Sequence, residues 1–105
     1  MLAQMERVKA DLLRIAELSR QVVARPNDPG PRCEVGKILM RNGMEAEGLG
    51  WLATALRCDP LHAATHQALA EHYERTGETA RAAEHWELAG QGHRPLTLPQ
   101  PGGSR

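Results

Sequence analysis

The stretch that decides the fold is Val35-Gly36-Lys37-Ile38-Leu39, which returns 34 residues later as Leu69-Ala70-Glu71-His72-Tyr73. The same offset relates Gly43 and Gly77, Gly48 and Ala82, Leu52 and Trp86, Ala55 and Ala89, and Pro26 and Pro60. A fixed period in this range is typical of a stacked array of identical supersecondary units. Such arrays usually present a surface to a partner. The sequence therefore predicts an adaptor or scaffold and not an enzyme.

The composition narrows the class of protein further. The chain has 105 residues, enough for one domain, and its 13 basic and 13 acidic residues cancel, so no net field draws it to nucleic acid or anionic lipid. Aromatic residues make up only 3% and Phe is absent, which favours helices over strands. No apolar run approaches the roughly 20 residues of a membrane span, and Glu6 and Arg7 interrupt the start, unlike in a secretory signal. We expect an all-α, cytoplasmic protein that binds neither nucleic acid nor a membrane.

Residues 1–25 are predicted to form one N-terminal packing or capping helix. No Gly or Pro occurs before Pro26, and a heptad seam with alternating spacings of three and four is formed by Met5, Val8, Leu12, Ile15, Ser19 and Val22. Leu2, Leu13 and Leu18 widen the apolar stripe, which favours packing on a neighbour within the fold. The charged residues between them, Asp11 and Arg14 included, are expected to form a solvated face.

Residues 26–94 are predicted to hold two helical hairpins, at about 29–62 and 63–95. Asp28 can cap the first of their helices and Pro29 suits its first turn. The predicted helices cover about 29–41, 45–57, 63–76 and 79–89, with Gly43 and Gly77 closing the first helix of each hairpin. The remainder is rich in Gly and Pro, so residues 95–105 are predicted to be a flexible tail.

Each unit resembles a tetratricopeptide repeat (TPR), whose pattern is W-x2-L-G-x2-Y, then A-x3-F and a closing P. In the first unit the pattern falls on Arg32, Val35, Gly36, Leu39, Gly48, Leu52, Ala55 and Pro60. In the second it falls on His66, Leu69, Ala70, Tyr73, Ala82, Trp86 and Ala89, with Pro95 one residue late. Arg32 and His66 stand where the family often has an aromatic residue. The resemblance implies hairpins that cross closely at their small residues, and protein–protein interaction as the function.

The resemblance also implies a partner-binding face, because the first helix of each TPR hairpin lines the concave side of the array. Carried over by position, the expected set is Cys33, Glu34, Lys37, Met40, Arg41, Gln67, Glu71, Glu74 and Arg75. Lys37 has no supporting Asn, so a clamp for the C-terminal carboxylate of chaperones is not expected. The expected partner is another protein or a peptide. The alternative is structural self-assembly as a homo-oligomer, through the first helix or the uncapped end of the array.

No combination of residues predicts catalysis, a cofactor or a metal site. The chain has no G-x-S-x-G, H-E-x-x-H or P-loop motif. His62 and His66 are four residues apart but have no third ligand at a suitable spacing and are expected at the surface, while His72, His85 and His93 have no companion pattern. Cys33 and Cys58 form no C-x-x-C pair and are expected to be reduced, while a disulfide between them stays open because the predicted helices that carry them are neighbours.

Overall fold

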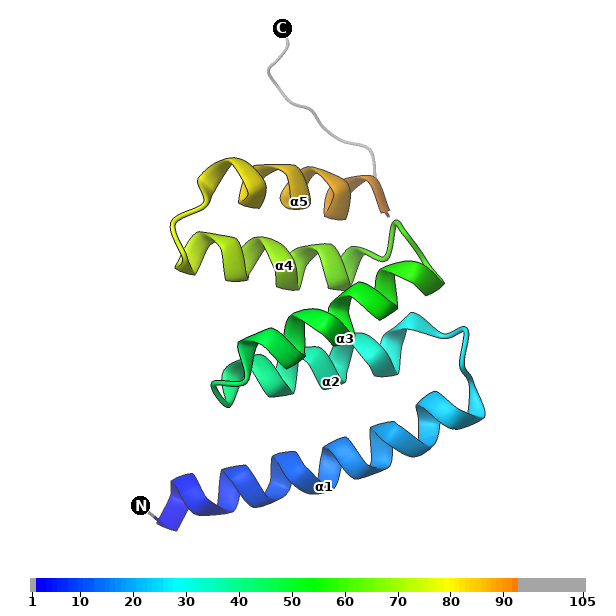
Figure 1. Cartoon of the computed structure of the whole chain (residues 1–105), viewed down its shortest axis with the longest axis vertical. Helices are drawn as coiled ribbons and strands as arrows, with labels where there is room; N and C mark the ends of the chain where they lie inside the picture. Colours follow the sequence, from blue (N-terminus) through cyan, green and yellow to red (C-terminus); the bar gives the residue numbers. More distant parts are fainter. Residues whose placement is uncertain (1, 93–105) are drawn as a thin grey trace, which may run out of the picture.

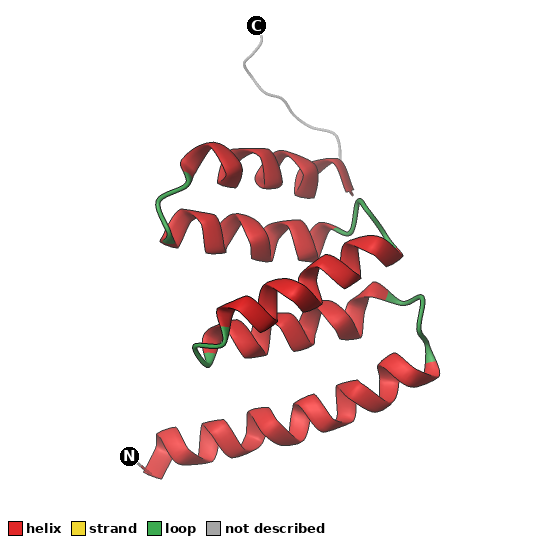
Figure 2. Cartoon of the chain, viewed as in Figure 1, coloured by secondary structure: helices red, strands yellow, loops and turns green. Residues whose placement is uncertain are grey.

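The computed structural model describes residues 2–92, and the side chains of residues 5–90. This part of the chain folds into five helices, labelled in Figure 1: α1 (Leu2–Ala24), α2 (Pro29–Arg41), α3 (Glu45–Cys58), α4 (Ala63–Arg75) and α5 (Thr79–Gly92). Figure 2 shows loops but no strand between them within this range. The predicted all-α helical-hairpin array is confirmed. The predicted tail over residues 95–105 lies outside the described residues.

The helices stack as two hairpins with one additional helix. α2 pairs with α3 and α4 pairs with α5, while α2 and α3 both contact α4. α1 packs along α2, so that α1 and α5 lie at opposite ends of the stack (Figure 1). None of the helices in residues 2–92 is long and apolar enough to cross a membrane.

The helix ends follow from local sequence. The Asp28 carboxylate accepts a hydrogen bond of 2.9 Å from the backbone N–H of Gly30, and Pro29 occupies the first turn of α2. Gly43 and Gly77 have φ values of 86° and 84°, in the left-handed region that residues with a Cβ seldom adopt. These two glycines therefore turn the chain between the helices of each hairpin.

The first hairpin crosses with backbone almost touching backbone. A Cβ added to Gly36 would lie 2.8 Å from the carbonyl oxygen of Gly48, and one added to Gly48 would lie 2.7 Å from that of Gly36. Ala70 and Ala82 take the corresponding positions of the second hairpin and are buried. The small residues of the repeat are thus where α2 meets α3 and where α4 meets α5.

The apolar core lies in two clusters. The larger cluster joins the hairpins and comprises Cys33, Met40, Leu52, Ala55, Ala68 and Leu69. The smaller cluster joins α1 to α2 and comprises Leu18, Val35 and Ile38. Leu52 is 0% exposed, whereas Trp86, at the same repeat position of the second hairpin, is 37% exposed. The described residues therefore cover this position fully in the first hairpin and only partly in the second.

The face of α1 that packs on α2 shares Ile15 and Leu18 with the predicted apolar stripe but leaves much of the heptad seam exposed. Leu18 is 1% exposed and Asp11 is buried, whereas the seam residues Met5 and Leu12 are 67% and 62% exposed. The packed face includes Asp11, Ile15 and Leu18, so the prediction that Asp11 lies on a solvated face is wrong.

Asp11 is buried where it makes a set of polar contacts with the C-terminal end of α2. Arg41 Nε donates to Asp11 Oδ2 over 3.2 Å, and Asn42 Nδ2 donates to the same oxygen over 3.0 Å. Asn42 Nδ2 also donates to the Ile38 carbonyl oxygen over 2.8 Å. The hydrogen bonds from Arg41 and then Asn42 hold the pKa of Asp11 below its ordinary value. These polar contacts and the apolar cluster of Leu18, Val35 and Ile38 hold the same side of α1 against α2.

Candidate partner-binding groove

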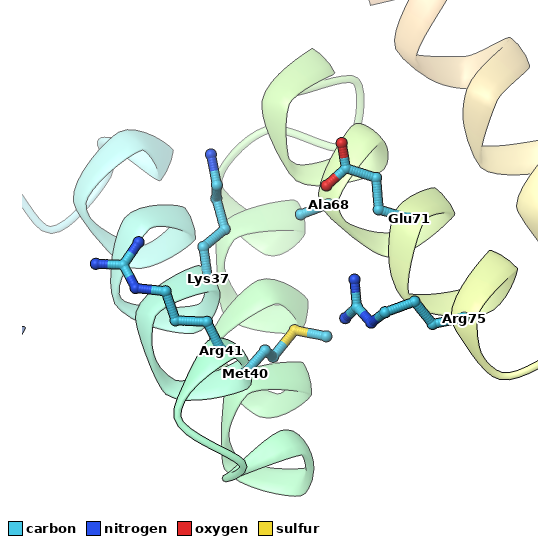
Figure 3. Close-up of a pocket in the computed structure, with 6 residues that line it drawn as sticks. All are labelled: Lys37, Met40, Arg41, Ala68, Glu71 and Arg75. Carbon is cyan, nitrogen blue, oxygen red and sulfur yellow. The ribbon is translucent and has the colours of Figure 1, made fainter. Parts of the chain in front are cut away.

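Two adjoining cavities form a groove over α2 and α4. The first, of about 480 Å³, is shown in Figure 3 and is lined by Lys37, Met40, Arg41, Ala68, Glu71 and Arg75. The second, of about 330 Å³, is lined by Arg14, Gly30, Cys33, Glu34, Lys37, Ile38, Arg41, His62 and Ala64. Lys37 and Arg41 line both cavities. The groove therefore runs from α1 and the start of α2 to the end of α4.

Helical spacing gives the groove an apolar floor and a charged rim. Cys33, Lys37 and Met40 follow one another at intervals of four and three residues, which places them on one side of α2. Cys33 and Met40 are buried, and Ala68 of α4 is buried beside them. Lys37 and Arg75 are exposed. A ligand in this groove would meet methyl and thioether surface below and charges at its edges.

Ion pairs within the groove leave two cations free. Arg14 donates to both carboxylate oxygens of Glu34, over 3.0 and 3.1 Å, and Arg41 is paired with Asp11. These hydrogen bonds raise the pKa of both guanidinium groups. Lys37 and Arg75 make no salt bridge with any residue whose side chain the structure describes. The cationic groups available to a ligand are therefore Lys37 and Arg75, opposed only by Glu71.

The structure brings seven of the nine expected partner-binding residues to this groove, namely Cys33, Glu34, Lys37, Met40, Arg41, Glu71 and Arg75. Gln67 is exposed but lines neither cavity. The Glu74 carboxylate points to the last helix, where it accepts a hydrogen bond of 2.7 Å from the indole N–H of Trp86.

Arg14 belongs to the groove although the sequence did not indicate it. Its side chain comes from α1, and the heptad pattern predicted that Arg14 would lie on the solvated face of this helix. A second stripe, Asp11, Ile15 and Leu18 at spacings of four and three, was the available signal. That stripe places Arg14 next to α2.

The expectation that His66 lies at the surface is wrong, because its side chain is 3% exposed, and His72 is also buried, at 6%. His66 fills the position where the TPR pattern often has an aromatic residue, and its ring stacks on that of His85 with centroids 5.1 Å apart. Tyr73 stacks on the His85 ring at 5.6 Å. The residues that the structure describes contain no group of three His, Cys, Asp or Glu side chains placed to hold a metal ion.

The two stacked histidines are joined by a hydrogen bond between ring nitrogens. His66 Nε2 lies 2.7 Å from the Pro60 carbonyl oxygen, which can only accept, so this nitrogen carries hydrogen. His66 Nδ1 and His85 Nδ1 are 2.9 Å apart, and a hydrogen bond between them needs one protonated and one bare nitrogen. Both rings cannot be cationic while this bond exists. It links α4 to α5.

We therefore expect the protein to lose stability in mild acid. Burial, and next the nearby His66, lower the pKa of His85 from 6.5, with Glu84 opposing and Arg81 adding to the shift. The unfolded chain then binds the proton more readily, so this contribution is complete above about pH 6.5 and is lost as the pH falls through the lowered pKa. Urea unfolding of the parent and of His85→Gln at about pH 8 and about pH 5 measures it. The parent should lose more stability than the variant, and equal losses would show that His85 does not titrate as described.

The two cysteines are both free thiols, so the disulfide that the sequence left open is not formed. Cys33 is buried, and burial raises the pKa of its thiol, which keeps it protonated and unreactive. Cys58 is half-buried at the end of α3, with its sulfur 3.5 Å from the Pro26 carbonyl oxygen.

No model of a known protein family matches the chain. A curated protein that it resembles is the TPR repeat-containing thioredoxin TTL4 of Arabidopsis thaliana, with 34% identity over 77 residues. The aligned region is 73% of this chain and 11% of that protein, so the chain spans about a tenth of the length of the relative. The chain is thus similar to part of a protein that contains TPR repeats.

Proposed function

We propose that the chain is a tetratricopeptide repeat module that binds a segment of another protein, and that it acts as a non-catalytic adaptor. The observation that carries this proposal is the repeated hairpin, whose crossings at Gly36 and Gly48 and at Ala70 and Ala82 place α2 and α4 along one groove. A cytoplasmic location, expected from the sequence, is part of the same proposal.

The similarity to a TPR repeat-containing thioredoxin supports the repeat part of that name and not the redox part. The described chain consists of helices, and the sequence holds no C-x-x-C motif of the kind that thioredoxin chemistry uses. Cys33 is buried and protonated, which does not suit a redox role. We therefore attribute the similarity to a repeat whose use is recognition.

The groove favours an acidic segment with apolar side chains. Lys37 and Arg75 stand at the rim without an ion pair in the described residues and would attract carboxylates. Met40 and Ala68 form a floor that an apolar side chain can cover. An extended peptide in which acidic and apolar residues alternate would place one kind of side chain on the floor and the other at the rim.

Fluorescence anisotropy with two labelled peptides tests the proposal. One peptide alternates Glu with Leu, and the other has Lys in place of Glu. We expect only the acidic peptide to bind, more weakly as salt is added because the contacting charges are exposed. Lys37→Glu and Arg75→Glu should each weaken binding several-fold.

Arg57→Glu is the matched control, because Arg57 is exposed on α3 and lines neither cavity. This substitution changes the net charge by the same amount as Lys37→Glu or Arg75→Glu. This variant should bind like the parent. Equal weakening by all three reversals would mean that the peptide responds to net charge alone, and equal binding of both peptides would remove the groove from the proposal.

A further inference from the structure

We infer that α1 is an interaction surface for a second copy of this chain, and that two α1 helices pair antiparallel on the side that faces away from α2. This inference is independent of the groove. The other side of α1, which carries Leu18, packs on α2.

The apolar side chains left exposed in the fold are concentrated on α1. Among residues 5–90, whose side chains the structure describes, eight large hydrophobic residues are exposed, and five of them belong to this helix: Met5, Val8, Leu12, Leu13 and Val23. Their exposed fractions are 67%, 42%, 62%, 66% and 81%. Apolar side chains gathered in this way mark an interaction site more than a solvated surface.

The cause of the exposure is the position of α1 relative to α2. The Asp11–Arg41 ion pair places the end of α2 beside the middle of α1. The N-terminal part of α1 therefore extends beyond α2, as Figure 1 shows. Leu18 and Asp11 occupy the side that faces α2, and no described residue packs over Leu13 or Val23 enough to bury them.

The exposed residues form a continuous stripe. Met5 and Val23 are 18 residues apart, about five full turns, so they lie on one line along the helix. Leu12 and Ala16 lie near the same line between them, whereas Val8 lies about 60° to one side of it and Leu13 about 80° to the other. A straight helix with such a stripe presents it to another helix.

The stripe is complementary to a reversed copy of itself. About a two-fold axis level with residue 14, which is the midpoint of both pairs, Met5 comes close to Val23 of the second copy, and Leu12 comes close to its Ala16, a large side chain beside a small one. In the same arrangement Glu6 lies within two residues, about 3 Å of helix rise, of the level of Arg20 in the second copy, and Lys9 lies equally near the level of its Glu17. These long side chains can span that offset, and Arg20 and Glu17, which form an ion pair within each helix, can join the contact, which symmetry forms twice. A parallel pair would instead place Glu6 opposite Glu6, and Arg20 opposite Arg20. The charges therefore select the antiparallel copy.

Sedimentation equilibrium of the full chain over a range of concentrations tests the inference. We expect a monomer–dimer equilibrium in the parent and loss of the dimer in Leu12→Glu, with helical circular dichroism retained because Leu12 packs against nothing that buries it. Leu61→Glu is the matched control, since Leu61 is 50% exposed and lies outside α1. It should dimerise like the parent.

Charge exchange tests the direction of the pairing. Glu6→Arg or Arg20→Glu alone should weaken the dimer, and the two substitutions together should restore it, because the opposed pairs are formed again with their signs reversed. A parent that stays monomeric, or a dimer that Leu12→Glu leaves intact, would overturn the inference. A double variant that dimerises no better than the single ones would overturn the antiparallel pairing.

Discussion

Gly48→Ala should lower the free energy of unfolding by about 1 to 3 kcal/mol, because it overpacks the crossing of the first hairpin. The added Cβ would overlap Met40 Cγ and approach the Gly36 carbonyl oxygen to 2.7 Å. The backbone oxygen cannot move without separating α2 from α3. Helix propensity by itself predicts the opposite sign, since Ala stabilises a helix relative to Gly. Urea unfolding followed by circular dichroism measures which effect is larger.

Gly50→Ala provides the matched control in the same helix. Nothing lies within 4 Å of a Cβ added to Gly50, so the substitution changes propensity without changing packing. It should raise the free energy of unfolding by about 0.5 to 1 kcal/mol. If Gly48→Ala were stabilising to the same degree, the two hairpin helices could not cross as closely as described.

Leu18→Ala should cost about 2 to 5 kcal/mol, the range for truncating a fully buried leucine. Leu18 is 1% exposed and is the buried apolar residue that α1 contributes to its cluster with Val35 and Ile38. Its loss should release α1 before the hairpins unfold, since the larger cluster between the hairpins contains no residue of α1. Hydrogen exchange should therefore show early loss of protection in residues 2–24.

Leu13→Ala is the control for this prediction. Leu13 is 66% exposed on the same helix, so its truncation should change stability by less than about 0.5 kcal/mol. Both variants are best compared at protein concentrations low enough to keep α1 unpaired. Equal effects of the two substitutions would mean that Leu18 is packed no better than the exposed Leu13.

The features that the sequence predicted well are those that repeat. Gly36 and Gly48 have partners 34 residues later, and this offset indicated both hairpins and their crossings. The helix ends were also predictable, because Asp28, Gly43 and Gly77 act on residues next to them in the chain. Within the candidate groove, the side chains of α2 were implied by the resemblance to a tetratricopeptide repeat, which carried them over by position.

The features that the sequence did not predict depend on contacts between distant residues. The apolar residues of α1 spread over more than one side of the helix, and the side that packs includes Asp11, whose partner Arg41 lies 30 residues away in the chain. Glu74 was assigned to the groove by position, but the Trp86 indole N–H draws its carboxylate to α5. His66 is buried because His85 supplies a matching ring from another helix. No local pattern contains these pairings.

Leu52 and Trp86 hold the same position in successive units, and the difference in their exposure has a consequence for how such a protein can change in length. The first hairpin receives α4 over Leu52, and the second offers a similar surface around Trp86. Duplication of one 34-residue unit would supply a hairpin that finds small crossing residues and a large side chain already in place. Growth by whole units then requires no new packing solution, so the number of hairpins, and with it the reach of the groove, is free to vary during evolution or design.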